Sequence, residues 1–372
     1  MLPFAAMGNK TGVVGLAVGM AVVVASSMIT VGTVSPAAAA PVVIPRPLPT
    51  TSGPAFPVNQ VTGLGDTNDT PARFSILGTD LGITWDNGSG EILAAFGDTA
   101  YFNGESLLYG SLYHWRSNVL LRSNDRNLRD GMSISGGAMR SPGFAKRLLV
   151  PDHAREVTLI PTAGAEINGK QYMTYMSVKS WGLPNYWQTN FAGIAESTDN
   201  GQSWNRIDAI RPNTGGNQKF QMGALLKVGG MVYVYGTASG RQGAVYLARV
   251  PEPQFTDLAA YQYFSNGNWV PGNPEAATPV MGAPNGEMSV AYNDYLGKYI
   301  SLSTRDGTDL RTSDTPEGPW SAPQPIVNQN EVPGSYAPYI HPWSSGNTLY
   351  FTLSIAGIYN VVLMRLPLDS VR

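Results

Sequence analysis

Two aspartates flank a short predicted hairpin in the first third of the chain. Asp80 lies in the motif Gly-Thr-Asp-Leu-Gly-Ile, and Asp98 lies in Phe-Gly-Asp-Thr. Two apolar runs enclose a turn over residues 86–90 that is rich in Gly, Asn and Asp, a pattern typical of a β-hairpin. The simplest register pairs Asp80 with Phe96 and makes the two aspartates diagonal neighbours on one face, about 7–8 Å apart.

A pair of carboxyl groups at that separation suits acid–base hydrolysis of a glycosidic bond. Inverting glycosidases hold their two carboxyls about 6.5–9.5 Å apart so that a water fits beside the sugar, whereas retaining enzymes need about 5–5.5 Å. A register slip of one residue would send the side chains to opposite faces, and a slip of two would place them directly opposite each other. The alternative for both aspartates is structural, with each capping a turn by accepting hydrogen bonds from backbone amides.

Other polar and aromatic side chains are candidates for binding a sugar chain. Glu287 could be a third carboxylate that tunes the pKa of the acid or binds a hydroxyl, or it could be an exposed turn residue. Arg241 could bind hydroxyls or lie at the tip of a surface hairpin. Aromatics and amides in irregular stretches can stack on sugar faces or bind hydroxyls, with packing as the alternative for the aromatics. Four further candidates belong to this group: Trp181, Asn190, Tyr336 and His341.

The composition argues against metal, cofactor and nucleic-acid chemistry. The chain has no cysteine, and its three histidines lie far apart in the sequence, so no metal site and no cofactor is predicted. It also has no G-x-S-x-G elbow, P-loop or dinucleotide fingerprint. A formal net charge of −2 offers no basic stripe for a phosphate backbone, so a neutral polysaccharide fits better than a nucleic acid. A monomer is expected.

The elements that must position these residues are short strands. The chain contains 42 glycines, 28 prolines and 18 tyrosines, and from about Val61 onward no 12-residue stretch follows a helical period, which favours an all-β fold. Short apolar runs recur in five units, near residues 61–130, 150–212, 215–275, 280–325 and 333–372. Five such units predict a five-bladed β-propeller, with a six-bladed ring or a sandwich as alternatives.

A turn motif that occurs twice also favours a propeller. Residues 197–204 fit the pattern S-x-D-x-G-x-x-W of the Asp-box turns in sialidase-like blades, and residues 311–320 resemble the related turn of furanosidase propellers. In such turns the aspartate bonds local backbone amides and the tryptophan packs between blades. We therefore assign structural roles to Asp199, Trp204, Asp314 and Trp320.

The N-terminal region reads as an export signal followed by a spacer. Lys10 precedes an apolar run over residues 13–34, and four alanines at 37–40 could be cut by a signal peptidase. The run could instead remain as an uncleaved membrane tether. The prediction is a signal peptide or anchor over residues 1–40, a proline-rich linker over 41–57 and one domain over 58–372. Either way the domain is expected outside the cytoplasm, secreted or in the cell envelope.

The two aspartate motifs together resemble a known family. Gly-Thr-Asp-Leu-Gly-Ile followed by Phe-Gly-Asp-Thr is similar to the signature of the domain-of-unknown-function 4185 family, some of whose members are endo-D-arabinanases of glycoside hydrolase family 183. The resemblance continues through residues 155–158, 181–204, 235–241 and 287–293. It implies a five-bladed propeller that cleaves α-linked D-arabinofuranose chains, such as those in actinobacterial arabinogalactan and lipoarabinomannan.

The resemblance also implies roles for the two aspartates. Asp80 and Asp98 match the positions of the acid and the base, and the place of Asp98 at the end of an apolar strand slightly favours it as the base. A non-catalytic propeller that binds envelope glycan or protein is the alternative, because a fold does not fix a function. A sialidase is the weakest reading, because the sequence offers no obvious set of three arginines around a carboxylate site.

Overall fold

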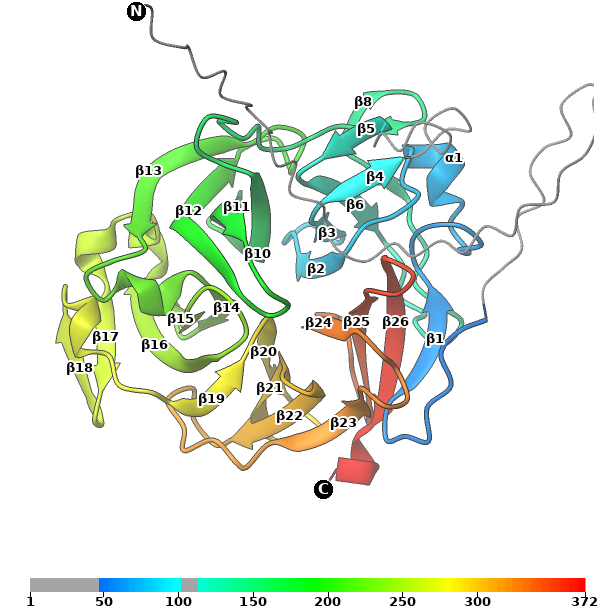
Figure 1. Cartoon of the computed structure of the whole chain (residues 1–372). Helices are drawn as coiled ribbons and strands as arrows, with labels where there is room; N and C mark the ends of the chain where they lie inside the picture. Colours follow the sequence, from blue (N-terminus) through cyan, green and yellow to red (C-terminus); the bar gives the residue numbers. More distant parts are fainter. Residues whose placement is uncertain (1–46, 102–112, 372) are drawn as a thin grey trace, which may run out of the picture. The chain divides into compact units, whose positions relative to one another are not determined.

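Five antiparallel sheets contain nearly all of the regular structure (Figure 1). The structure is a computed structural model and describes residues 47–101 and 113–371. The first sheet contains β2 (Leu81–Asp86), β3 (Ile92–Phe96), β6 (Val119–Ser123) and β7 (Gly136–Gly137). The second contains β10 (Thr158–Ile167), β11 (Lys170–Trp181), β12 (Trp187–Ser197) and β13 (Asn205–Pro212). The third contains β14 (Met222–Val228), β15 (Met231–Thr237), β16 (Gly243–Pro251), β17 (Gln262–Ser265), β18 (Asn268–Pro271) and β19 (Met281–Asn285).

The remaining two sheets complete the set. The fourth contains β20 (Met288–Asn293), β21 (Lys298–Thr304), β22 (Gly307–Ser313) and β23 (Gln324–Asn328). The fifth contains β24 (Ser335–Ile340), β25 (Thr348–Ile355), β26 (Asn360–Pro367) and β1 (Phe56–Gln60). Two small pairs lie beside the first sheet: β4 (Thr99–Tyr101) with β5 (Tyr113–Arg116), and β8 (Met139–Ser141) with β9 (Phe144–Ala145). The helical elements are short: α1 (Thr70–Phe74), η1 (Asn217–Phe220), η2 (Glu252–Gln254), η3 (Leu258–Ala260), η4 (Pro274–Ala276) and η5 (Leu368–Val371).

The five sheets are the blades of a β-propeller. Each sheet has one inner edge strand, namely β2, β10, β14, β20 and β24. Each inner strand contacts its counterpart in the next sheet, and β24 returns to β2 (Figure 1). The ring closes through the N-terminal strand, because β1 pairs antiparallel with β26 as the outer strand of the fifth blade. The prediction of an all-β, five-bladed propeller is therefore confirmed.

The N-terminal strand shifts one predicted boundary. β1 begins at Phe56 and Ala55 is fully buried, so the expected start of the domain at residue 58 falls inside a strand. Pro57 makes this segment look unlike a strand in the sequence. Proline is tolerated here because β1 is an edge strand of its sheet. The predicted export segment lies outside the described residues. Among those that are described, no helix is long and apolar enough to cross a membrane.

Tryptophans join the first two blades, as the turn motif predicted. Trp204 is buried and its ring lies edge-on to that of Trp85, with centroids 6.3 Å apart. Gly164 on β10 has no room for a side chain, because a Cβ there would overlap the Trp85 ring. Asp199 accepts hydrogen bonds from the Ser203 amide (2.8 Å) and from the Ser197 hydroxyl (2.8 Å), all within its own turn. The structural roles of Asp199 and Trp204 are thus confirmed.

The related turn in the fourth blade has a similar structural role. Trp320 packs edge-on against Tyr235 of the third blade, with ring centroids 5.9 Å apart. Asp314 is exposed and its carboxylate bonds Lys298 at 2.6 Å. Trp320 therefore fits its predicted structural role, whereas Asp314 bonds a lysine side chain instead of the backbone amides of its turn that the prediction gave it.

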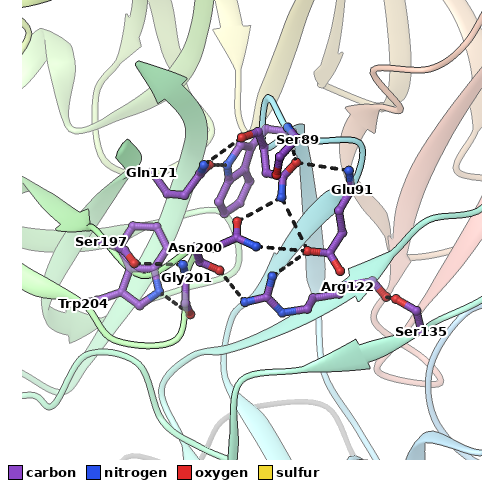
Figure 2. A network of polar contacts seen from close by, with 11 residues as sticks. Ser89, Glu91, Arg122, Ser135, Gln171, Ser197, Asn200, Gly201 and Trp204 are labelled. Carbon is purple, nitrogen blue, oxygen red and sulfur yellow. Dashed lines mark hydrogen bonds and ion pairs between the residues drawn. The ribbon is translucent and has the colours of Figure 1, made fainter. Parts of the chain in front are cut away.

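A polar network fastens the Asp-box turn to the first blade (Figure 2). Asn200 accepts a hydrogen bond from Asn87 at 2.9 Å and donates one to Glu91 at 3.3 Å. Arg122 donates to Glu91 at 2.7 Å and also to the Asn200 carbonyl oxygen. Gln171 links the same hairpin to β11, because it accepts from the Trp85 indole at 2.9 Å. The hairpin after β2 is therefore held by side chains of the neighbouring blade.

Removing one member of this network should weaken the fold measurably. Asn200→Ala is expected to lower the free energy of unfolding by about 1–2 kcal/mol, because it deletes two hydrogen bonds and leaves alanine at a φ of 56°. Asn200→Gly deletes the same bonds but tolerates that φ, so it should cost less. Chemical denaturation measures both. Equal costs for the two variants would mean that the backbone conformation at residue 200 contributes nothing.

Candidate active site

The hairpin that carries the two aspartates has a bulge, and the bulge sets their positions. Leu81 pairs with Phe96 and Ile83 with Ala95, so one extra residue, Gly82, is inserted between them. The predicted register, with Asp80 opposite Phe96, is therefore wrong by one residue at this end, and the separation of about 7–8 Å that it implied for the two carboxyls does not carry over. Instead, the Gly97 amide donates to the Asp80 carbonyl oxygen at 3.2 Å. Asp80 thus lies beside Gly97, next to Asp98.

Backbone strain immediately follows Asp80. Leu81 has a φ of 71°, in the left-handed region that bulky residues rarely adopt, and Gly82 has a φ of 72°. Two side chains of the fifth blade stabilise the turn: Ser354 accepts from the Leu81 amide at 2.8 Å, and Thr352 donates to the Gly82 carbonyl at 2.7 Å. Strain that neighbouring structure holds in place is common at functional sites.

Burial and the local hydrogen bonds make Asp80 an unusual carboxyl group. Its Oδ2 accepts from the Tyr336 hydroxyl at 2.8 Å, whereas its Oδ1 is buried with no hydrogen-bond partner. A Cβ at Gly97 would overlap that Oδ1. Burial raises the pKa of Asp80 to about 7, against the lowering effect of the Tyr336 hydrogen bond. The charge of Glu287 raises this pKa further and that of Arg241 opposes it.

The pKa of Asp98 is raised, as is that of Asp80. Its Oδ1 accepts from the Thr158 hydroxyl at 2.6 Å, at the start of β10. Burial raises the pKa of Asp98 to about 8, the Thr158 hydrogen bond lowers it, and the nearby charge of Asp80 raises it. The positive charge of Arg147 opposes the shift. The negative charge of Asp80 therefore makes Asp98 harder to ionise.

A third carboxylate lies beside Asp80 in a buried ion pair. Arg241 donates to Glu287 through Nη2 at 2.7 Å and through Nε at 2.8 Å. The guanidinium also lies over the rings of Tyr336 (4.8 Å) and Trp187 (5.4 Å). Burial alone would raise the pKa of Glu287, but the attraction and hydrogen bonds of Arg241 outweigh burial and lower it. Glu287 is therefore ionised at neutral pH.

All five blades contribute to this cluster, which lies at one end of the central channel. Further along the channel the inner strands line a cavity of about 370 Å³, which the carboxyls of the cluster do not line; each blade contributes one residue to the set Ile83, Ala163, Ala224, Met288 and Tyr339. Glu287 directly precedes Met288, and Asp80 lies three residues before Ile83. Tyr359, in the turn between β25 and β26, donates to the Asp98 carbonyl oxygen at 2.9 Å.

The structure brings together most, but not all, of the residues predicted for the site. Asp80, Asp98, Glu287, Arg241 and Tyr336 form the cluster. Trp181 lies at its edge, exposed, with its ring centroid 6.0 Å from that of Trp187. Among the described residues, no group of three or more His, Cys, Asp or Glu side chains is arranged to hold a metal ion.

Two predicted site residues make other contacts, and this corrects the prediction for them. Asn190 donates to the Arg155 carbonyl (2.9 Å) and the Ser177 hydroxyl (3.1 Å), so its amide is used within the second blade. His341 directly follows β24, at the end of the strand opposite Tyr336 and beyond a register shift at which Ala337 has a φ of 55°. It accepts from the Trp343 amide at 3.2 Å, and burial lowers its pKa to about 4. Neither side chain contacts the carboxyl cluster.

Several residues of the cluster were not singled out from the sequence. Thr158 lies within a stretch of the family resemblance, but a lone threonine before a strand gives no sign of its partner. Tyr359 and Arg147 each come from turns with no motif around them. Tyr359 lies before Asn360 in a tight hairpin turn with a φ of 49°, a conformation that a tyrosine in the sequence does not predict.

Sequence comparison places the chain in a family. A family profile described as a domain of unknown function (DUF4185) matches residues 65–365. The chain belongs to the DUF4185 family. It is 31% identical to "Notoamide biosynthesis cluster protein J" of Aspergillus sp. (strain MF297-2), over 78% of this chain and 83% of the relative. It is 27% identical to an "Uncharacterized 35.9 kDa protein in asd 3'region" of Mycolicibacterium smegmatis, over 68% of this chain and 80% of that protein.

Solved structures share the propeller fold of this DUF4185 protein. A candidate hydrolase from Bacteroides ovatus aligns with a TM-score of 0.55 and 13% identity, over 81% of this chain and 89% of its own. An exo-β-1,3-galactanase from Phanerochaete chrysosporium aligns with a TM-score of 0.52 and 12% identity, over 85% of this chain and 64% of its own. At these identities the likeness concerns the fold, which this family shares with a glycoside hydrolase.

Proposed function

We propose that this DUF4185 protein is a secreted endo-D-arabinanase that cleaves α-D-arabinofuranosyl linkages by acid–base catalysis. The observation that carries the proposal is the pair of adjacent carboxyls at one end of the propeller channel, with pKa values raised to about 7 and about 8. A carboxyl that titrates near neutral pH can serve as an acid or a base in water. The propeller fold shared with a glycosidase supports glycoside hydrolysis, and the family resemblance at both aspartate motifs is the support for D-arabinan as the substrate.

Asp98 is the acid and Asp80 is the base in this mechanism. Asp98 has the higher pKa and donates its proton to the leaving glycosidic oxygen as the bond from the anomeric carbon breaks. Asp80 accepts a proton from the water whose oxygen forms the new bond to that carbon, with inversion. The Tyr336 hydroxyl and the charge of Arg241 favour the ionised form that a base requires. These contacts reverse the slight preference for Asp98 as the base.

The ion pair beside the aspartates has a binding and electrostatic role. Glu287 stays ionised and raises the pKa of Asp80 towards neutrality, and Arg241 presents a fixed array of N–H donors that suits sugar hydroxyls. A neutral polymer needs no additional charge in the site. The proposed substrate belongs to a cell envelope, and the export segment predicted over residues 1–40 would deliver the enzyme to it.

The decisive experiment is digestion of purified D-arabinan by the full-length protein. An endo-acting enzyme releases a ladder of oligosaccharides with new reducing ends, whereas an exo-acting enzyme releases monomer. L-arabinan and galactan serve as matched polymers in the same assay. Binding to D-arabinan with no new reducing ends would instead support a non-catalytic envelope propeller.

Gly97→Ala tests the placement of Asp80 without touching either carboxyl. The new methyl group would overlap the Asp80 Oδ1 and displace that carboxyl. A misplacement of ~1 Å can cost about 10²-fold in rate, so kcat on D-arabinan should fall by that order. Gly136→Ala is the matched control, because a Cβ there meets nothing within 4 Å. If Gly97→Ala keeps wild-type kcat, the position of Asp80 is not critical.

A further inference from the structure

The hairpin between β11 and β12 extends past the carboxyl cluster. Thr158, which bonds Asp98, pairs with Val178 on β11. The strand then continues to Trp181, and β12 returns from Trp187. The tip of this hairpin therefore lies beyond Thr158 on the same end of the channel as the aspartates.

The tip exposes aromatic and apolar side chains. Trp181 is 43% exposed, Tyr186 is 55% exposed and Leu183 is 76% exposed. The tip sequence from Trp181 to Trp187 is Trp-Gly-Leu-Pro-Asn-Tyr-Trp and contains no charged residue. An exposed apolar surface of this kind marks a binding site more often than a chance feature.

Three aromatic rings and the Arg241 guanidinium connect this surface to Asp80. The rings of Trp181 and Trp187 lie edge-on with centroids 6.0 Å apart. The Arg241 guanidinium lies over Trp187 at 5.4 Å and over Tyr336 at 4.8 Å. Tyr336 in turn donates to the Asp80 carboxylate at 2.8 Å. A chain of packed side chains therefore links the exposed surface to the candidate active site.

The hairpin tip is held in one place. Asn185 has a φ of 69°, which asparagine tolerates, and its side-chain oxygen accepts from the Arg241 Nη1 at 3.0 Å. Its backbone oxygen accepts from the Arg241 amide, also at 3.0 Å. The tip closes on itself through the Gly182 amide, which donates to the Tyr186 carbonyl at 3.0 Å. A fixed aromatic surface binds without a large cost of ordering.

We propose that Trp181 and Tyr186 form a distal sugar-binding surface that holds the polysaccharide several residues away from the scissile bond. This inference rests on the proposed function and extends it, because a distal surface selects long chains over short ones. The occupant is a neutral sugar chain, since the tip carries no charge and the three rings with Arg241 lead to the aspartates. The flat faces of tryptophan and tyrosine suit the C–H faces of sugar rings.

The test measures binding as a function of chain length. The probes are D-arabinan oligosaccharides of graded length, titrated calorimetrically into full-length Asp98→Asn so that they are not cleaved. Adding Trp181→Ala or Tyr186→Ala should weaken binding of the longest oligosaccharides by ~10-fold, which corresponds to about 1.4 kcal/mol. Binding of the shortest oligosaccharides should be unchanged. Tyr186→Phe should retain full affinity, because stacking does not need the hydroxyl.

A matched aromatic pair elsewhere provides the control. Tyr292 is 50% exposed and its ring lies edge-on to that of Tyr299, with centroids 5.1 Å apart, as the Trp181 ring does to Trp187. It lies five residues along β20 from Glu287, away from the cluster. Tyr292→Ala should therefore leave affinity unchanged at every length.

The other outcomes distinguish failure of the distal surface from failure of the proposed hydrolase. If adding Trp181→Ala leaves the affinity of Asp98→Asn unchanged at every chain length, or if Asp98→Asn binds no D-arabinan, the distal surface is overturned. Sedimentation that shows a wild-type dimer converted to monomer by Trp181→Ala, with sugar affinity intact, assigns the surface to self-association instead. Length-dependent binding by a wild-type protein that releases no reducing ends leaves the surface standing and removes the hydrolase.

Discussion

Asp98→Asn is expected to lower kcat on D-arabinan by ~10³-fold or more while the propeller still folds. The amide cannot donate a proton to the leaving oxygen, and general acid catalysis is worth about 10²–10⁴-fold. Asp80→Asn should have an effect of the same order through loss of the base. Asp86→Asn is the control, because Asp86 ends β2, the strand that follows Asp80, and bonds the Trp343 indole away from the carboxyl pair. Wild-type turnover in either active-site variant would remove that residue from the mechanism.

Asp98→Asn should also be more stable than the wild type at alkaline pH. Burial raises the pKa of Asp98 from 3.8 in the unfolded chain to about 8 in the folded protein. The stability that this shift supplies is fully present below pH 3.8 and is lost as pH rises through 8. Asp98→Asn cannot ionise, so its Tm should exceed that of the wild type by at least ~2 °C at pH 9, with a smaller gap at pH 5. A gap that does not grow with pH would contradict the raised pKa.

Arg241→Met is expected to cost about 3–5 kcal/mol of unfolding free energy, the largest stability effect that the site should give. The change leaves the Glu287 carboxylate buried without its cation, whereas replacing both partners avoids an unpaired charge. The double variant Arg241→Met, Glu287→Gln should therefore be more stable than Arg241→Met alone. Urea denaturation at pH 7 measures all three proteins. A double variant no more stable than the single one would mean that the buried charge is not the cause.

The pH dependence of this effect has a definite sign. Arg241 holds the pKa of Glu287 below its ordinary value of 4.5. A lowered pKa contributes stability above the unfolded pKa, and this contribution is lost as pH falls through the folded pKa. The difference between wild type and Arg241→Met should accordingly shrink in acid. Arg241→Lys keeps the charge but not the two parallel hydrogen bonds, so it should lie between them.

The blades and the aspartate pair could be predicted from the sequence because both depend on local patterns. Turn-rich spacing gave five units, and two short motifs located Asp80 and Asp98. The exact pairing could not be predicted, because the bulge at Gly82 depends on Ser354 and Thr352 from the last blade. Contacts that join distant blades leave no trace in a local pattern.

His341 was predicted for the site from the sequence, but the structure places it elsewhere. Its residue type and its closeness in sequence to Tyr336 suggested a shared site, but β24 carries the two side chains to opposite ends of the blade. Along a strand, five residues span about 16 Å, so proximity in sequence is not proximity in space. The order of the inner strands around the ring, and not the motif itself, decides which side chains meet.

The pairing of β1 with β26 has a consequence for how the protein matures. Gln60 is matched with Val362, about three hundred positions later in the chain. On the ribosome the earliest strand must wait until almost the whole polypeptide has been synthesised before its partner exists, and such remote contacts slow folding. Trimming that stops before Phe56 should spare the final sheet, whereas cutting further would remove its outer strand and let the circle of blades open.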